Sequence, residues 1–189
     1  MTQKVQVRAE STPNPSTMKF VADKILCPET REYADAPSAM ESPLAYKIFG
    51  FPWASKVFLG GDFVAVTKQD WVGWDILAEP LRDLIAEHLE AGEPLVHDNA
   101  VSDSSDAGIL ESDSNDVKMI KTVLYNEIRP AVAMDGGQIS FVKYDGGVLF
   151  LKMQGSCSGC PSSQITLKQG IETRMKEAVP GLSEVRSVD

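Results

Sequence analysis

The stretch Gly155-Ser156-Cys157-Ser158-Gly159-Cys160-Pro161 places two cysteines three positions apart in a turn rich in glycine and serine. Proline is favoured at the first position of a helix, so we predict that this turn leads directly into one. Three residues span at most about 11 Å when fully extended, and a turn brings the two sulfurs closer still. We therefore identify Cys157 and Cys160 as candidate ligands of one metal ion or of one edge of a cluster.

Two thiolates supply only half of an ordinary metal site. Tetrahedral zinc and iron–sulfur clusters usually take about four protein ligands, yet the chain has a single pair of cysteines at this spacing. The third cysteine, Cys27, precedes Pro28 and has no partner within metal-ligand spacing, so we interpret it as a buried or incidental thiol. The motif alone leaves three functions open, namely zinc binding, thiol–disulfide exchange and cluster binding.

The charge of the chain is concentrated in one segment. The net charge of −9 comes from 27 acidic and 18 basic residues. Residues 92–116 hold seven acidic residues and no basic one, whereas residues 117–189 hold nine basic and seven acidic residues. Because no basic run is long enough to follow a phosphate backbone, we exclude a broad nucleic-acid-binding surface.

The same acidic segment suggests how the chain is divided. Residues 92–116 are rich in serine and aspartate and contain no aromatic residue, a composition typical of a flexible, solvated linker. A loop of this length inside one compact domain would be unusual. We therefore predict an N-terminal domain over residues 1–91, a flexible acidic linker over 92–116 and a C-terminal domain over 117–189.

Residues 1–91 have the pattern of two hairpins and two helices. Short stretches of alternating apolar and polar residues flank turn-forming residues, which is typical of hairpins. The serine–proline pair at Ser42-Pro43 is typical of a helix N-cap and first turn. We predict, in order, a hairpin of residues 5–9 and 18–22, a short helix over 42–49, a second hairpin of residues 57–59 and 63–67, and a helix over 76–92.

Residues 117–189 combine helices with one hairpin. Asp145-Gly146-Gly147 is a strong turn signal, and apolar residues at helical spacing precede and follow it. We predict a helix from Val117 capped by Asn115 or Asp116 and ending near Pro130, strands at about 139–144 and 148–153, a helix from Pro161, and a short strand near Val185. The fold class is therefore α+β, with two small domains of β-hairpins and helices joined by the flexible acidic linker.

These motifs resemble a known family. The second half has Arg129-Pro130, Asp135-Gly136-Gly137, Asp145-Gly146-Gly147, the whole stretch 155–163 and residues 167–171. The first half adds Thr12-Pro13-Asn14-Pro15, Met18-Lys19-Phe20, Ser42-Pro43-Leu44-Ala45 and Gly61-Asp62-Phe63. In this combination the chain resembles the NifU-like (Nfu) iron–sulfur cluster scaffold and carrier proteins, over nearly everything except the linker.

The resemblance implies a function and a ligand set. It implies a [4Fe–4S] cluster shared between two subunits, each of which provides Cys157 and Cys160, and this sharing would remove the ligand deficit. The loaded protein would be a homodimer that receives its cluster from a donor and delivers it to apo iron–sulfur client proteins, without being an enzyme and without nucleic-acid or membrane partners. Gln138 stands where many relatives carry an acidic residue, and we expect cluster binding to tolerate it.

The residue types around the motif suit such a role. A position just before a helix lowers the pKa of a thiol, and we expect Cys160 to gain most from this. Gly155 and Gly159 allow the backbone to approach an inorganic core closely. The alternative functions are a thiol–disulfide oxidoreductase and a zinc-binding interaction module.

The N-terminal sequence bears on the compartment. The first residues lack an apolar signal core and have few arginines, unlike a transit peptide. An odd number of cysteines also argues against a disulfide framework. We predict a bacterial cytoplasmic protein, or a mitochondrial matrix protein if the chain is a trimmed organellar form.

Overall fold

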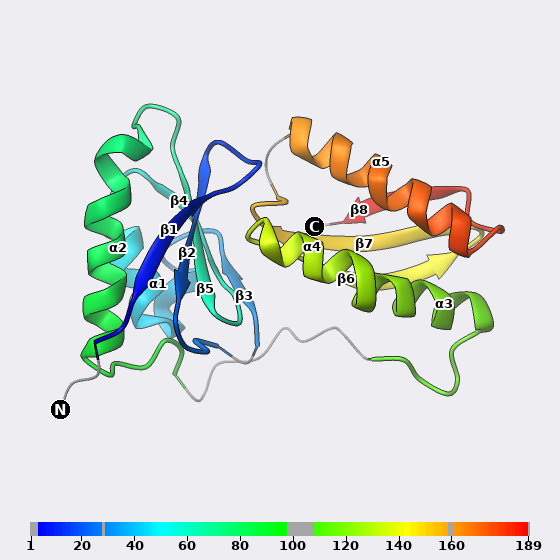
Figure 1. The fold of residues 1–189 in the computed structure, drawn as a ribbon, viewed down its shortest axis with the longest axis horizontal. Coiled ribbons are helices and arrows are strands. Elements are labelled where there is room, and N and C mark those ends of the chain that lie inside the picture. The colour runs from blue at the N-terminus through cyan, green and yellow to red at the C-terminus, as the bar shows by residue number, and fades with distance from the viewer. Residues whose placement is uncertain (1–3, 28, 98–107, 159–160, 189) are drawn as a thin grey trace. The chain divides into compact units, whose positions relative to one another are not determined.

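The computed structural model (Figure 1) describes residues 4–27, 29–97, 108–158 and 161–188, and of residues 161–164 it describes only the backbone. The chain folds as two compact units, Met1–Asp103 and Ser104–Asp189. Each unit combines helices with a β-sheet, which confirms the α+β fold class predicted from the sequence.

The N-terminal unit is built on a five-stranded antiparallel sheet in the order β1-β2-β5-β4-β3. Its strands are β1 (Val7–Ser11), β2 (Thr17–Ala22), β3 (Arg31–Tyr33), β4 (Ala54–Leu59) and β5 (Phe63–Lys68). The two predicted hairpins are confirmed, and they join into one sheet because β2 pairs with β5. Strand β3 was not anticipated from the sequence, since three residues are too few to establish an alternating pattern.

Two helices cover one face of this sheet. A 3₁₀ turn (η1, Ser38–Glu41) precedes α1 (Pro43–Phe49), and α2 spans Trp74–Glu90. The predicted cap is confirmed, because the Ser42 hydroxyl accepts a hydrogen bond of 3.1 Å from the Ala45 N–H and Pro43 is the first helical residue. Pro80 lies inside α2.

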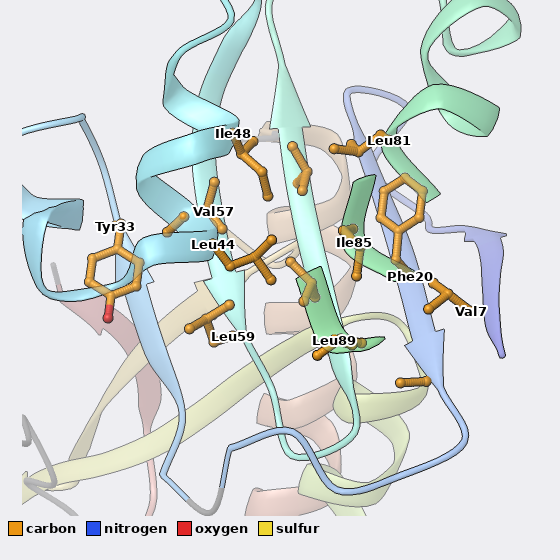
Figure 2. Packing of buried hydrophobic residues seen from close by; sticks show 14 of the residues in the cluster. Val7, Phe20, Tyr33, Leu44, Ile48, Val57, Leu59, Leu81, Ile85 and Leu89 are labelled. Atoms are coloured by element: carbon orange, nitrogen blue, oxygen red, sulfur yellow. The ribbon is translucent and has the colours of Figure 1, made fainter. Parts of the chain in front are cut away.

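The core of the N-terminal unit lies between the sheet and these helices (Figure 2). Figure 2 shows side chains of α1 and α2 directed toward strands β2 and β4. The largest fully buried side chains of this core are Phe20, Leu44, Ile48, Leu59 and Ile85.

The C-terminal unit has a helical layer and a three-stranded sheet in the order β6-β7-β8. Its elements are α3 (Asn115–Val123), a π-helical turn η2 (Leu124–Ile128), α4 (Arg129–Met134), β6 (Gly137–Asp145), β7 (Val148–Gly155), α5 (Pro161–Ala178) and β8 (Glu184–Val188). The predicted hairpin corresponds to β6 and β7, and the predicted last strand is β8, which pairs in parallel with β7.

The first helix of the C-terminal unit differs from the prediction at both ends. Its N-cap is Ser114, whose hydroxyl accepts from the Val117 N–H at 3.3 Å, so the predicted caps Asn115 and Asp116 are wrong. The helical run also continues past Pro130 to Met134. Proline lacks an N–H and its ring clashes with the carbonyl four residues earlier, and the wider π turn just before it lets the chain stay helical.

Both ends of the predicted linker are hydrogen-bonded to the rest of the structure. At its N-terminal end the His97 N–H donates to the Glu41 carbonyl at 2.9 Å. At its C-terminal end the buried Lys121 ammonium donates to the Asp113 carboxylate at 2.8 Å. Residues 98–107 lie outside the described residues, so a flexible linker stays a prediction there.

The core of the C-terminal unit lies between its sheet and its helices. Its fully buried members include Ile120, Leu124, Ile139, Leu149, Leu151 and Met175. Within the described ranges, every helix is too short or too polar to cross a membrane.

Candidate functional site

Cys157 lies in the loop that follows β7. Gly155 ends the strand with a φ of +68°, a conformation that glycine adopts without steric cost. The Ser158 N–H and the Ser158 hydroxyl then both donate to the Gly155 carbonyl, at 3.1 and 3.0 Å. These hydrogen bonds form a tight turn in which Cys157 occupies a central position.

A second loop, distant in sequence, holds this turn in place. Gly137 of β6 pairs with Gly155 of β7. The Ser156 N–H donates to the Gly136 carbonyl at 3.1 Å, and the Ser156 hydroxyl donates to the Asp135 carbonyl. The structure therefore brings the Asp135-Gly136-Gly137 motif against the cysteine turn, and it is the backbone of the motif that makes the contact.

Gly137 lies directly against the Cys157 sulfur. A Cβ atom added at Gly137 would overlap the Cys157 Sγ, and it would lie 3.0 Å from the Gln154 carbonyl oxygen and 3.2 Å from the Cys157 Cβ. Only a residue without a side chain fits this position. The sequence shows Gly136-Gly137 as a glycine pair. The need for glycine at position 137 becomes clear only from the position of Cys157 beside it.

The Cys157 thiol is buried. Its residue is 6% exposed, and burial raises the pKa of the thiol to about 11. The hydrogen bond with the Ser156 hydroxyl lowers this pKa by a smaller amount, and the Asp135 carboxylate raises it by a still smaller one. For Cys157 this overturns the expectation of a lowered pKa, because desolvation outweighs the favourable position before α5. The thiol is protonated at neutral pH and would release its proton on binding a metal.

The second candidate ligand is Cys160. Cys160 lies outside the described residues, and so does Gly159. Helix α5 starts at Pro161, as predicted. The pairing of Cys157 with Cys160 therefore stays a prediction from the sequence.

The third cysteine belongs to the other unit. Cys27 is 6% exposed, and its Sγ donates to the Glu29 carbonyl at 2.7 Å. Burial raises the pKa of its thiol. These contacts agree with the interpretation of Cys27 as a buried thiol rather than a ligand.

The described residues do not complete a metal site by themselves. Among them, no group of three or more histidine, cysteine, aspartate or glutamate side chains is placed to hold a metal ion.

One further side chain supports this end of the sheet. The Arg129 Nε donates to the Ile139 carbonyl of β6 at 2.9 Å. Its guanidinium carbon lies 4.3 Å from the centre of the Tyr125 ring. Burial lowers the pKa of the guanidinium, which nevertheless stays charged at neutral pH. In the sequence, Arg129 is recognisable only as part of the motif Arg129-Pro130, which predicts no role for its side chain.

Comparison with known proteins identifies the family. The profile of the NifU-like domain matches residues 120–186, which include Cys157 and its supporting loop. The profile of the scaffold protein Nfu/NifU N-terminal domain matches residues 7–92. The chain belongs to the NifU-like (Nfu) family. Each Nfu profile covers one of the two structural units and leaves the acidic segment unmatched.

Nfu relatives align along almost the whole chain. It is 42% identical over 186 residues to "NifU-like protein 5, mitochondrial" of Arabidopsis thaliana, covering 97% of this chain and 66% of the relative. It is 38% identical over 184 residues to "NFU1 iron-sulfur cluster scaffold homolog, mitochondrial" of Drosophila erecta, covering 96% of this chain and 64% of the relative. The chain thus spans a little under two thirds of the length of these relatives.

One solved structure aligns with about half of the chain. The solution NMR structure of a NifU-like protein from Saccharomyces cerevisiae aligns with a TM-score of 0.47 and 21% identity, covering 52% of this chain and 91% of that one.

Proposed function

We propose that this Nfu-family chain is an iron–sulfur cluster carrier that holds a [4Fe–4S] cluster between two copies of itself, through Cys157 and Cys160 of each, and delivers it to apo-proteins. The observation that carries the proposal is the placement of the Cys157 thiol in a tight turn against Gly137, where a Cβ atom would overlap the Cys157 Sγ. Among the described residues no metal-binding group of three is present, so a second copy is the simplest source of the missing thiolates.

The site suits a soft thiolate-bound cargo. Thiolates are the usual ligands of iron–sulfur clusters, and Gly137 leaves space at the sulfur where any side chain would intrude. The segment 117–189 has nine basic and seven acidic residues. A cubane with four thiolates carries a charge of roughly −2, which two such domains would partly neutralise.

Release follows from the same arrangement. Each copy contributes only two ligands, so a recipient with its own thiolates can replace them one at a time by ligand exchange. No substrate is chemically converted in this process, because the cluster is passed on as a cargo. The proposed role is therefore that of a non-enzymatic carrier.

The partners follow from the cargo. A carrier needs a donor that supplies the cluster and apo iron–sulfur proteins that receive it. The relatives from Arabidopsis thaliana and Drosophila erecta are named as mitochondrial proteins, which supports the mitochondrial alternative for this chain. A bacterial cytoplasmic location stays a prediction.

Anaerobic reconstitution with iron and sulfide tests the proposed function. The wild-type protein should turn brown, bind about four irons per pair of chains, and transfer them to an apo iron–sulfur protein. Cys157→Ala and Cys160→Ala should abolish this uptake. Cys27→Ala is the matched control and should load normally, because Cys27 lies in the other unit.

Other outcomes would contradict the carrier function. Undiminished transfer by the Cys157→Ala protein would exclude the proposed ligands. Colourless protein with tightly held zinc would favour a zinc-binding interaction module. Reversible formation of a Cys157–Cys160 disulfide without metal uptake would favour a thiol–disulfide oxidoreductase.

A further inference from the structure

Arg129 connects three elements of the C-terminal unit at the end of the sheet that carries Cys157. It is the first residue of α4, it contacts Tyr125 in η2, and it donates to Ile139 in β6. Figure 1 shows α4 lying alongside β6. Ile139 is two residues from Gly137, the residue that supports the Cys157 sulfur.

The hydrogen bond to Ile139 has a structural reason. Strand β6 is at the edge of the sheet order β6-β7-β8, so part of its backbone has no neighbouring strand to pair with. A carbonyl of a fully buried residue such as Ile139 on this edge needs a donor. The Arg129 Nε provides one at 2.9 Å, and it does so close to the start of β6 rather than at its far end.

Arginine is suited to this position in a way that lysine is not. Its planar guanidinium can stack on the Tyr125 ring while one N–H points at the Ile139 carbonyl. Tyr125 and Arg129 are four residues apart, a spacing that places them on the same side of the helical run. The ring contact restricts the arginine side chain, so that its hydrogen bond restricts β6 in turn.

We propose that Arg129 is a positioning residue for Cys157. By holding the Ile139 carbonyl against the helical layer, it fixes the start of β6, and Gly137 there fixes the sulfur of Cys157. The inference deepens the proposed function, and its cluster readout rests on that function. Its main readout does not, because the hydrogen bonds that it measures join residues of this chain alone.

Amide hydrogen exchange of the metal-free full chain tests this role. The reporter is the Ser156 N–H, which donates to the Gly136 carbonyl beside the site. The reference is the Val185 N–H, which donates to the Glu172 carboxylate in the same unit. Arg129→Met should speed exchange at Ser156 about tenfold more than at Val185, which corresponds to about 1.4 kcal/mol of local opening.

Two further variants separate positioning from general stability and from charge. Arg174→Met removes an exposed arginine that pairs with Glu127 at 2.7 Å, and it should leave the ratio of the two exchange rates unchanged. Arg129→Lys keeps the charge but cannot both stack and donate in the same way, so it should raise the ratio part of the way. If Arg129→Met does not fold, the ratio of the two exchange rates in Arg129→Lys tests the positioning role instead.

The outcomes are distinct. Equal acceleration at Ser156 and Val185, or none at Ser156, would overturn the positioning role. With cluster-loaded protein, Arg129→Met should shorten the time for a chelator to remove the iron, whereas Arg174→Met should not. If wild-type protein takes up no cluster while the exchange ratio changes as expected, the carrier function fails and the positioning of Cys157 by Arg129 stands.

Discussion

Replacing Gly137 by alanine tests how tightly the site is built. The added Cβ would overlap the Cys157 Sγ and lie 3.0 Å from the Gln154 carbonyl oxygen. The φ of Gly137 is not among the positive values, so the expected penalty is steric and not a backbone preference. Ordinary contacts of a Cβ begin near 3.4 Å, so the sulfur would have to move by on the order of 1 Å in a packed interior.

The size of the effect follows from this overlap. Inserting a methyl group into a well-packed site typically costs about 1–3 kcal/mol. For a unit of this size each kcal/mol lowers the Tm by roughly 4–8 °C. The Gly137→Ala protein should therefore show a clearly lower Tm for the C-terminal unit. It should also lose cluster uptake, because a displaced thiolate no longer meets the metal.

The matched control is Gly170→Ala in the same unit. Gly170 lies within α5, and a Cβ there would contact nothing within 4 Å. Alanine in a helix is more stable than glycine by roughly 0.5–1 kcal/mol, so this variant should melt at a higher temperature and load normally. Calorimetry with iron and sulfide analysis measures both effects. If the Gly137→Ala protein melts and loads like wild type, a side chain at position 137 does not displace the Cys157 sulfur, and the steric argument is refuted.

Three further predictions concern stability, each read by thermal or chemical unfolding. Ser42→Ala removes the N-cap of α1 and should cost about 1 kcal/mol, whereas Ser42→Thr should retain most of the stability; equal losses would contradict the capping role. Burial and the nearby Lys47 lower the pKa of His88, so the folded N-terminal unit binds fewer protons than the unfolded chain. The contribution of His88 to the stability of this unit should therefore be fully present above about pH 6.5 and be lost as the pH is lowered through the folded pKa. If the stability of a His88→Gln protein depended on pH in the same way as that of the wild type, this would contradict the prediction. Lys121→Met should lower the Tm of the C-terminal unit and bring the pKa of Asp113 back up toward its usual value, since the ammonium of Lys121 holds it down; an unchanged Asp113 titration by NMR would argue against the pair.

The sequence predicted those parts of the fold that rest on local signals. Alternating residues around Thr12-Pro13-Asn14-Pro15 gave the first hairpin, and Ser42-Pro43 gave the start of α1. The cap of α3 was misplaced, because Ser114, Asn115 and Asp116 all favour that position and only the hydrogen bond distinguishes them. The pairing of β2 with β5 depends on contacts between distant segments, which periodicity does not reveal.

The sequence alone selects the candidate ligands, whose role stays a prediction, and it does not reveal their surroundings. Cys157 could be selected from spacing alone. The contacts of Gly137, Ser156 and Arg129 could not be, because they depend on how β6 lies beside β7. The pKa of Cys157 was misjudged for a related reason. A helix N-terminus is visible in the sequence, whereas the burial that outweighs it arises only on folding.

Native mass spectrometry of anaerobically reconstituted protein tests the shared cluster most directly. The account predicts one dominant iron-containing species whose mass equals two chains plus a single [4Fe–4S] cluster, and a return to lone chains once a chelator has removed the iron. A dominant species of one chain with a complete cluster would contradict it.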